Sequence, residues 1–312
     1  MNRREFLMST ASACLATKAA KIGTALGAAT PAPALRLSRC GTPRPTPSEK
    51  IQVNRVIGAL REYGITYRGK TVIPIRFHII HSGTRGYLPD RRLKAQVAVL
   101  NRAYAPASIA FTMIEPKLHE NEAWLLHQQG SDAEIEMKIA LGKDTARSLN
   151  IYTAEPAGLL GYAAYPWWYA ASPQLDGVVL HHASLPDAAR ASVDPPWPFD
   201  LGMTAVHEVG HWCGLYHTFE GGCEASGDDI ADTAYEEIGA SGCAQNQPSS
   251  CLGETGFNPV DNYMDSSDDA CMTHFTPLQY QRIKDLIVYY RSDLNPLIKR
   301  SALLAQIRKT IE

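Results

Sequence analysis

The feature that most constrains this chain is a group of three histidines and one glutamate within residues 207–217. His207 and His211 are four residues apart, so on a helix their imidazoles project from one face, about one turn from each other. Both rings can then reach one metal ion, and imidazole nitrogen is a preferred zinc ligand. Glu208 points to the flank of that face, where it can accept a proton from an attacking water as general base.

Gly214 predicts where a third ligand comes from. If the helix continued, His217 would lie about 240° around the axis from His211, away from the metal. Glycine tolerates the left-handed conformation that ends a helix and turns the chain, which would bring His217 back to the ion. Three protein ligands leave a coordination position open, as in catalytic zinc sites. The alternative, a helix with satisfied core histidines, requires these offsets to arise by chance.

Composition places the chain among ordinary globular proteins. It has 312 residues, of which 45% are apolar and 20% charged, enough for one large domain or two small ones. The 30 basic and 32 acidic residues give a formal net charge of −2 with no long block of one sign, which argues against nucleic acid as the main partner. No stretch reaches the roughly 18 uninterrupted apolar residues of a spanning helix, so no membrane insertion is expected after signal removal.

Residues 1–34 have the pattern of an export signal. Arg3 and Arg4 precede Phe6 and a run of small and mildly apolar residues, which resembles a bacterial twin-arginine signal. The alternative is an alanine-rich tail with a chance arginine pair. The signal predicts a secreted or periplasmic protein, with cleavage after Ala34.

Four of the seven cysteines cluster late in the chain, at Cys223, Cys243, Cys251 and Cys271. Four cysteines allow three pairings. A zinc site is an alternative, but none of these spacings gives the Cys-x-x-Cys element that such sites usually contain. Two disulfides in an oxidising compartment are therefore expected.

Periodicity and capping residues predict an α/β (α+β) fold with alternating strands and helices, followed by a long irregular stretch over residues 214–274. Helices are expected from residue 47 and over residues 89–104, 131–141, 201–213 and 276–290. Strands are expected over residues 71–80, 109–114, 149–152 and 177–180, with an edge strand over 161–165. Pro74 predicts an edge or irregular position for the first strand.

Residues 207–217 match the HExxHxxGxxH signature of the metzincin zinc proteases, and residues 262–265 resemble the Met-turn, with Met264, that lies beneath the metal in that clan. More narrowly, the chain resembles the pappalysin family, especially its small secreted microbial and fungal members. That resemblance covers most of residues 40–290, with its tightest motifs after residue 199. One departure is Ser266, where several metzincins have a tyrosine that assists at the metal.

The resemblance implies a metzincin-like catalytic domain over residues 61–295, with a twisted mixed sheet, long helices and an irregular C-terminal subdomain. A prosegment at 35–60 would precede it and a tail at 296–312 would follow. Substrate would lie extended between the subdomains. Gly161, Tyr162 and Ala163 are expected to form the edge strand that pairs with the substrate backbone.

The resemblance also implies how a precursor is kept latent. In the family, a prosegment cysteine occupies the open zinc position, and Cys40 followed by Gly41 resembles that element; a thiolate is a good zinc ligand. The alternative is an exposed, unpaired cysteine in a linker. The family pairing of the late cysteines would be Cys223 with Cys251 and Cys243 with Cys271.

Two further sites follow from the resemblance. Asp269 matches the acid at the floor of the pocket that receives the side chain after the scissile bond, which predicts cleavage before arginine or lysine. Asp268 is the weaker candidate, and both could be solvated loop acids. The segment from 228 to 233 resembles one where relatives bind calcium, with candidate ligands Asp228, Asp229, Asp232 and Thr233; solvated surface carboxylates are an equally ordinary interpretation.

The sequence therefore predicts a secreted zinc metalloendopeptidase that hydrolyses internal bonds of proteins or peptides and is made as a zymogen, with self-processing before Lys50 or Arg55. One alternative is a non-catalytic, zinc-stabilised secreted binding protein, which would have no use for the base Glu208. Another is an exopeptidase or a non-peptide amidohydrolase. These alternatives differ in whether internal bonds, terminal bonds or no bonds are cut.

Overall fold

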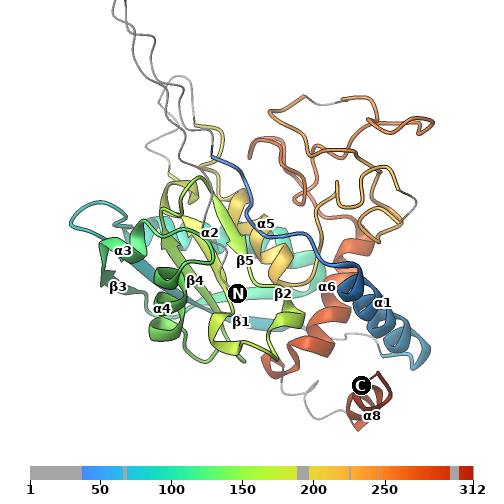
Figure 1. Ribbon diagram of the computed structural model, residues 1–312, viewed down its shortest axis with the longest axis horizontal. Coiled ribbons are helices and arrows are strands. Elements are labelled where there is room, and N and C mark those ends of the chain that lie inside the picture. Colours follow the sequence, from blue (N-terminus) through green and yellow to red (C-terminus); the bar gives the residue numbers. More distant parts are fainter. Residues whose placement is uncertain are drawn as a thin grey trace, which may run out of the picture. The chain divides into compact units, whose positions relative to one another are not determined.

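The computed structural model describes residues 37–65, 69–187, 197–224, 226–244, 246–295 and 302–311 (Figure 1). They belong to one compact unit, residues 36–312, and the expected export signal lies outside the described residues. The helices are α1 (Pro47–Glu62), α2 (Asp90–Tyr104), α3 (Glu122–Leu125), α4 (Asp132–Leu141), α5 (Met203–Trp212), α6 (Pro277–Tyr290) and α8 (Ala302–Ile311). The strands are β1 (Thr71–His81), β2 (Ile109–Met113), β3 (Lys117–Glu120), β4 (Leu149–Ala154), β5 (Gly161–Ala163) and β6 (Val178–His181).

All six strands form one mixed sheet with the order β2-β1-β4-β6-β5, and β3 pairs with the second half of β1. Every pairing is parallel except that of β5 with β6. β5 lies at the end of this order, so one of its sides has no strand partner in the sheet. The mixed α/β fold and the edge position of Gly161–Ala163 are as expected.

Alternate residues of β1 contribute to two cores, because successive side chains of a strand point to opposite faces. Ile73, Ile75 and Phe77 belong to the larger core, which α2 and α5 cover. Ile80 belongs to the smaller core on the other face, where Met137 of α4 packs. In Figure 1 the sheet separates α2 and α5 from α3 and α4. The larger core fixes α5 against the sheet near β5.

The expectation for Pro74 was only partly right. β1 is an internal strand, with β2 and β3 on one side and β4 on the other. However, pairing with β4 begins at Ile75, so Pro74 lies in the part of β1 that pairs with β2 alone. A proline is tolerated there because that side of the strand needs no ladder hydrogen bond. The short elements β3 and α3 and the helix α8 were not predicted from the sequence.

The α1 helix packs against α6 and α8. Thr46 and Glu49 form a capping box at its start. Its buried Val56 and Leu60 lie in one cluster with Val288 of α6 and Ile307 of α8. Figure 1 shows α1 beside α6. The described residues of α1 and α8 thus belong to the same compact unit as α6.

Between α5 and α6 the described residues form turns and isolated bridges, seen as the long orange loops in Figure 1. Two disulfides cross-link this region, joining Cys223 to Cys251 and Cys243 to Cys271. This is the pairing that the family resemblance implies. The cross-links restrain a stretch that has little regular backbone hydrogen bonding of its own.

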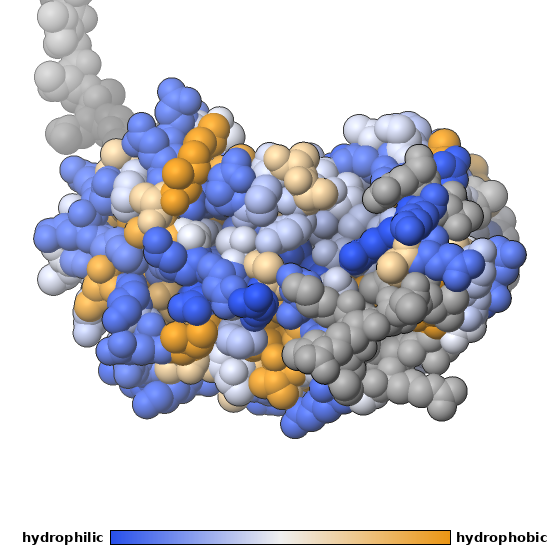
Figure 2. Space-filling view, turned by 90° about the horizontal axis from the view of Figure 1, so that it is seen from below, coloured by the Kyte–Doolittle hydropathy of each residue, from blue (hydrophilic) through white to orange (hydrophobic). Residues whose placement is uncertain are grey.

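Hydrophobic patches on the face seen in Figure 2 are small and separated by hydrophilic residues. Within the described part of the chain, no helix has both the length and the apolar character needed to cross a bilayer.

Candidate active site

The buried helix α5 supplies two of the three histidines and the glutamate. His207, Glu208 and His211 are fully buried. The helix ends near Gly214, whose φ of 99° is the left-handed conformation that the sequence predicts. A Cβ at this position would also meet Leu286 Cδ1, so glycine suits both the backbone conformation and the available space. The turn brings His217 back toward α5.

The three imidazoles converge on one point. His211 Nε2 lies 3.1 Å from His207 Nε2 and 3.1 Å from His217 Nε2. Nitrogen ligands of a tetrahedral zinc ion at about 2.0–2.1 Å lie about 3.3–3.4 Å apart, so the spacing fits one zinc ion. Cys40 Sγ completes the group, whose ligand atoms all lie within 4.8 Å of one another. It is the one such group of His, Cys, Asp and Glu among the described residues.

Hydrogen bonds orient two of the rings. His207 Nδ1 donates to the Tyr263 carbonyl at 2.8 Å, and His211 Nδ1 donates to the Leu215 carbonyl at 2.9 Å. These bonds place the proton on Nδ1 and leave Nε2 free for a metal. Burial lowers the pKa of all three histidines, that of His211 to about 4, so the neutral, metal-binding form dominates at neutral pH. The donor set fits zinc.

The fourth ligand candidate is a thiol. Burial is the main cause that raises the pKa of Cys40 well above its ordinary value, and the charge of Glu208 is the second. A thiolate here therefore needs a nearby cation to offset its charge, and a metal ion at the histidines would supply one. Thr42 N donates to Cys40 Sγ at 3.2 Å, which also favours the thiolate.

Glu208 lies between the histidines and the edge of the sheet. Burial raises the pKa of its carboxyl to about 8. Its Oε2 accepts a hydrogen bond from Thr42 Oγ1 at 2.9 Å and lies 3.5 Å from Cys40 Sγ. A Cβ at Gly161 of β5 would lie 2.9 Å from Glu208 Cγ, so glycine permits the close approach of strand and carboxylate.

The Met-turn passes directly under α5. Met264 is fully buried, and a Cβ at Gly210 would lie 2.5 Å from its sulfur. Gly210 thus makes room for the methionine beneath the histidines. The Tyr263 ring packs on Phe275, with 4.8 Å between the ring centroids, so its side chain belongs to the core. Tyr263 therefore does not take the place of the tyrosine that several metzincins have at the position of Ser266.

A segment of the chain's own N-terminal region occupies the free edge of β5. Gly41 N donates to the Gly161 carbonyl at 2.9 Å, and Ala163 N donates to Thr42 Oγ1 at 2.9 Å. Just before β5, Ser38 forms a parallel bridge with Leu159. Figure 1 shows this blue segment passing in front of β5 and α5. Tyr162 contributes only backbone here, since its hydroxyl bonds His127 in the other core at 2.6 Å.

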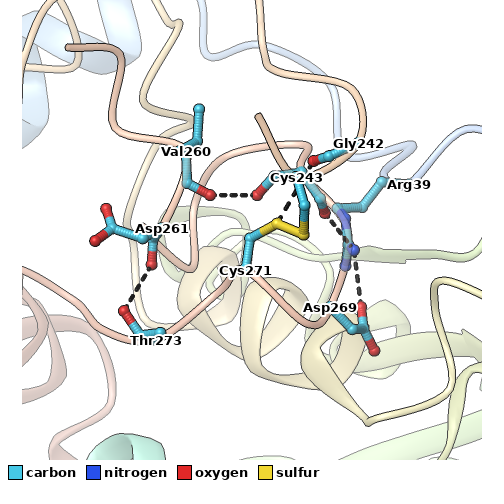
Figure 3. Close-up of a disulfide and its surroundings, with 9 residues drawn as sticks. Arg39, Gly242, Cys243, Val260, Asp261, Asp269, Cys271 and Thr273 are labelled. Atoms are coloured by element: carbon cyan, nitrogen blue, oxygen red, sulfur yellow. Dashed lines mark hydrogen bonds and ion pairs between the residues drawn. A yellow bond between two sulfur atoms is a disulfide. The ribbon is translucent and has the colours of Figure 1, made fainter. Parts of the chain in front are cut away.

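Arg39 and Asp269 form a buried ion pair that links this segment to the loop after the Met-turn. Arg39 Nη2 lies 2.8 Å from Asp269 Oδ1 and 2.6 Å from the Ser267 carbonyl. Figure 3 shows the pair beside the disulfide of Cys243 and Cys271. Asp268 is partly exposed, whereas Asp269 is buried. Arg39 was not predicted as a site residue, although Asp269 was expected to bind a basic side chain and Arg39 is adjacent to Cys40.

The second oxygen of Asp269 caps the histidine-bearing helix. Asp269 Oδ2 accepts from Leu201 N at 2.9 Å and from Met203 N at 3.2 Å, at the start of α5. A carboxylate there interacts favourably with the helix dipole. The Asp269 carboxylate therefore both caps the N-terminal end of α5 and binds the guanidinium of Arg39.

The four calcium candidates do not converge. Asp232 accepts from Thr276 Oγ1 and Leu278 N at the start of α6, and Asp229 accepts from Asn54 Nδ2 at 3.2 Å. Asp228 and Thr233 are buried, and the Thr233 side chain forms a hydrogen bond with the Asp228 carboxylate. Burial raises the pKa of Asp228 to about 7.

Comparisons with known proteins agree with this site. The model of the M43 peptidase family, described as pregnancy-associated plasma protein-A, matches residues 161–288. An extracellular metalloprotease of Verticillium alfalfae is 38% identical over 81% of this chain and 90% of its own length. One from Colletotrichum graminicola is 38% identical over 86% of this chain and 96% of its own. Mature mirolysin of Tannerella forsythia, solved with a cleaved peptide, superposes with a TM-score of 0.65 and 25% identity, covering 75% of this chain and 98% of that one.

The fold and site define a metalloendopeptidase of the metzincin type. The chain belongs to the pappalysin family of these enzymes.

Replacing Gly210 by alanine should disturb the Met-turn. The added methyl would meet Met264 Sδ, so we expect a loss of about 1–3 kcal/mol in the free energy of unfolding and a lower zinc content. Gly58→Ala is the matched control, because nothing lies within 4 Å of a Cβ there and alanine favours the α1 helix by about 0.5–1 kcal/mol. Denaturant unfolding and metal analysis measure both. Equal stability of the two variants would contradict the close packing of Met264 on α5.

Proposed function

We propose that this chain is a secreted zinc endopeptidase, made as a latent zymogen, that cuts before arginine or lysine. The observation that carries the proposal is the convergence of His207, His211 and His217 beside Glu208, at a sheet edge that can bind an extended peptide. The names of the fungal relatives, which are extracellular metalloproteases, support secretion. The twin-arginine route is part of the proposal, and export that survives Arg3→Lys with Arg4→Lys would contradict it.

The three histidines would hold zinc, which supplies Lewis-acid polarisation of the scissile carbonyl and acidifies water. The substrate backbone would pair with the Gly161 carbonyl and the Ala163 amide of β5, which orients the scissile bond beside Glu208. Glu208 accepts a proton from the attacking water as oxygen bonds to the carbonyl carbon. The same carboxyl then donates that proton to the leaving amine nitrogen as the C–N bond breaks.

Replacing Glu208 by glutamine should separate metal binding from activity. The amide cannot accept the proton, so cleavage of a protein substrate should fall by at least about 10²-fold while zinc content stays unchanged. His211→Ala should lose both. Mass spectrometry of the released peptides and metal analysis check these outcomes. Substantial cleavage by the Glu208→Gln enzyme, or release of terminal residues alone, would refute the proposed endopeptidase mechanism.

Latency is supported by three contacts of the segment before α1. Cys40 Sγ lies at the histidines, Thr42 Oγ1 donates to the catalytic carboxylate, and Arg39 pairs with Asp269. Cys40 thus occupies the open metal position, Thr42 binds the general base Glu208, and Arg39 fills the pocket of Asp269. The bridge between Ser38 and Leu159 is parallel, so this segment runs in the same direction as the chain that leads into β5. A substrate would have to displace all three contacts.

The unprocessed chain should gain activity when these anchors are removed. Cys40→Ala should free the metal position, and Arg39→Ala should weaken the segment by removing a buried ion pair whose loss costs about 3–5 kcal/mol. Arg44→Ala is the control, because that side chain is 64% exposed and its ion pair with Glu220 is long, at 3.9 Å. Peptidase assays before any processing test this. Equal activity of the wild-type, Cys40→Ala and Arg39→Ala precursors would remove the latency proposal.

The pocket around Asp269 should select a basic residue after the scissile bond. A buried carboxylate pairs with arginine or lysine far better than with an apolar side chain. Asp269→Asn should lower the preference for arginine over leucine at that position by at least about tenfold, whereas Asp268→Asn should leave it unchanged. Peptide-library profiling decides between them. An undiminished preference in Asp269→Asn would reject this pocket.

Self-processing before Lys50 or Arg55 requires local unfolding. Both residues lie within α1, whose buried side chains pack against α6. A protease binds an extended chain, so the first turns of α1 must unwind before either bond can enter a cleft.

Calcium binding at Asp228 and Thr233 is the remaining proposal. The two side chains are buried and interact with each other, and their oxygens are hard ligands of the kind that calcium takes. Added calcium should raise the Tm of the zinc-loaded protein by mass action, and Asp228→Asn should abolish the rise. A Tm that does not respond to calcium would contradict this site.

A further inference from the structure

A cavity of about 520 Å³ adjoins the cleft on the side of β5 away from Asp269. It lies between α4 and the segment that follows β5, and its walls are mostly apolar. Its larger apolar and aromatic lining side chains are Ile135, Tyr162, Trp167, Trp168, Tyr169 and Leu175. None of them takes part in the mechanism above. The volume is sufficient for the largest natural side chain.

The cavity is continuous with the peptide-binding edge. Ala163, whose amide binds Thr42 Oγ1, also lines the cavity, and so does Pro43, the next residue of the N-terminal segment. Arg39 lies in the Asp269 pocket and Cys40 lies at the histidines, so Pro43 is on the opposite side of the metal position from Arg39. If Arg39 marks the position after the scissile bond, the cavity borders positions before it.

The charged groups of the cavity are already neutralised. Lys138 pairs with Glu134 at 2.7 Å and lies over the Tyr162 ring, 5.2 Å from its centroid. Asp176 pairs with Arg291 at 2.8 Å. A charged side chain entering the cavity would therefore lose water without gaining an unpaired partner, whereas an apolar one would gain from burial.

In the unprocessed chain, which is the form that the test below uses, the aromatic wall is held in place. Trp167 Nε1 and Trp168 Nε1 both donate to Glu49 Oε1 of α1, at 3.0 and 2.5 Å. Indole groups fixed in this way present a preformed apolar surface, so binding costs little ordering of the protein.

We propose that this cavity is a specificity subsite that takes a large apolar side chain, two or three residues before the scissile bond. The inference rests on the proposed endopeptidase function. The subsite would act together with the Asp269 pocket, so the enzyme would recognise a bulky apolar residue and a basic residue on either side of the cut.

The test uses two peptides that each carry arginine after the cut and differ only in having phenylalanine or glycine at the second or third position before it. The enzyme is the full chain with Arg39→Ala and Cys40→Ala, which frees the cleft. We expect phenylalanine to raise kcat/KM by at least about tenfold over glycine at one of the two positions.

Two matched variants of α4 localise the effect. Ile135 lines the cavity and is 37% exposed; Ile139, one turn further along, is 57% exposed and does not line it. Ile135→Asp should remove most of the preference for phenylalanine, and Ile139→Asp should leave it intact. Equal cleavage of the phenylalanine and glycine peptides, or a preference that Ile135→Asp does not reduce, would overturn the subsite. Failure to cleave any peptide would instead contradict the endopeptidase function.

Discussion

The convergence of three imidazole nitrogens, with neighbouring Nε2 atoms 3.1 Å apart, is the constraint on which the other parts of the site depend. It requires a rigid α5, a chain reversal at Gly214 and two carbonyls that hold the Nδ1 protons. One of those carbonyls belongs to Tyr263, so the Met-turn must pass under the helix, which Gly210 permits. The C-terminal end of α5 is also held in place. Trp212 Nε1 donates to Asp176, and Asp176 pairs with Arg291, which follows α6. These contacts join residues far apart in the sequence, so the site depends on most of the fold.

The residues that we propose for specificity and latency contact the helix that carries His207 and His211. Asp269 accepts from the amides at the start of α5 and also binds the guanidinium of Arg39. A basic substrate side chain in that pocket would compete directly with Arg39. On the other side of the metal position, Glu49 of α1 fixes the two indoles of the apolar cavity. The segment that lies along β5 and the helix that follows it thus contact both regions that we propose for substrate recognition.

The local parts of this site were predictable because they depend on spacing along one element. The four-residue separation of His207 and His211 and the glycine at 214 specify a helix and a turn, and both are present. The sequence also predicts an edge strand over 161–165, and the structure has one at Gly161–Ala163. The contacts of Arg39 and Gly210 were not predicted, since they join segments more than fifty residues apart and depend on packing. The family resemblance makes Asp232 a candidate calcium ligand, whereas tertiary structure brings it to the start of α6, where it accepts hydrogen bonds. Pro74 was misleading for a similar reason, because a strand can be internal overall and unpaired on one side locally.

In the proposed latent state, one zinc ion is held by His207, His211 and His217 and closed by the thiolate of Cys40. X-ray absorption at the zinc edge distinguishes this ligand set from others, because sulfur and nitrogen ligands differ in distance. We expect three nitrogen ligands at about 2.0–2.1 Å and one sulfur at about 2.3 Å, with the sulfur lost in Cys40→Ala. A zinc ion with no sulfur ligand in the wild-type precursor, or with more than one, would contradict it.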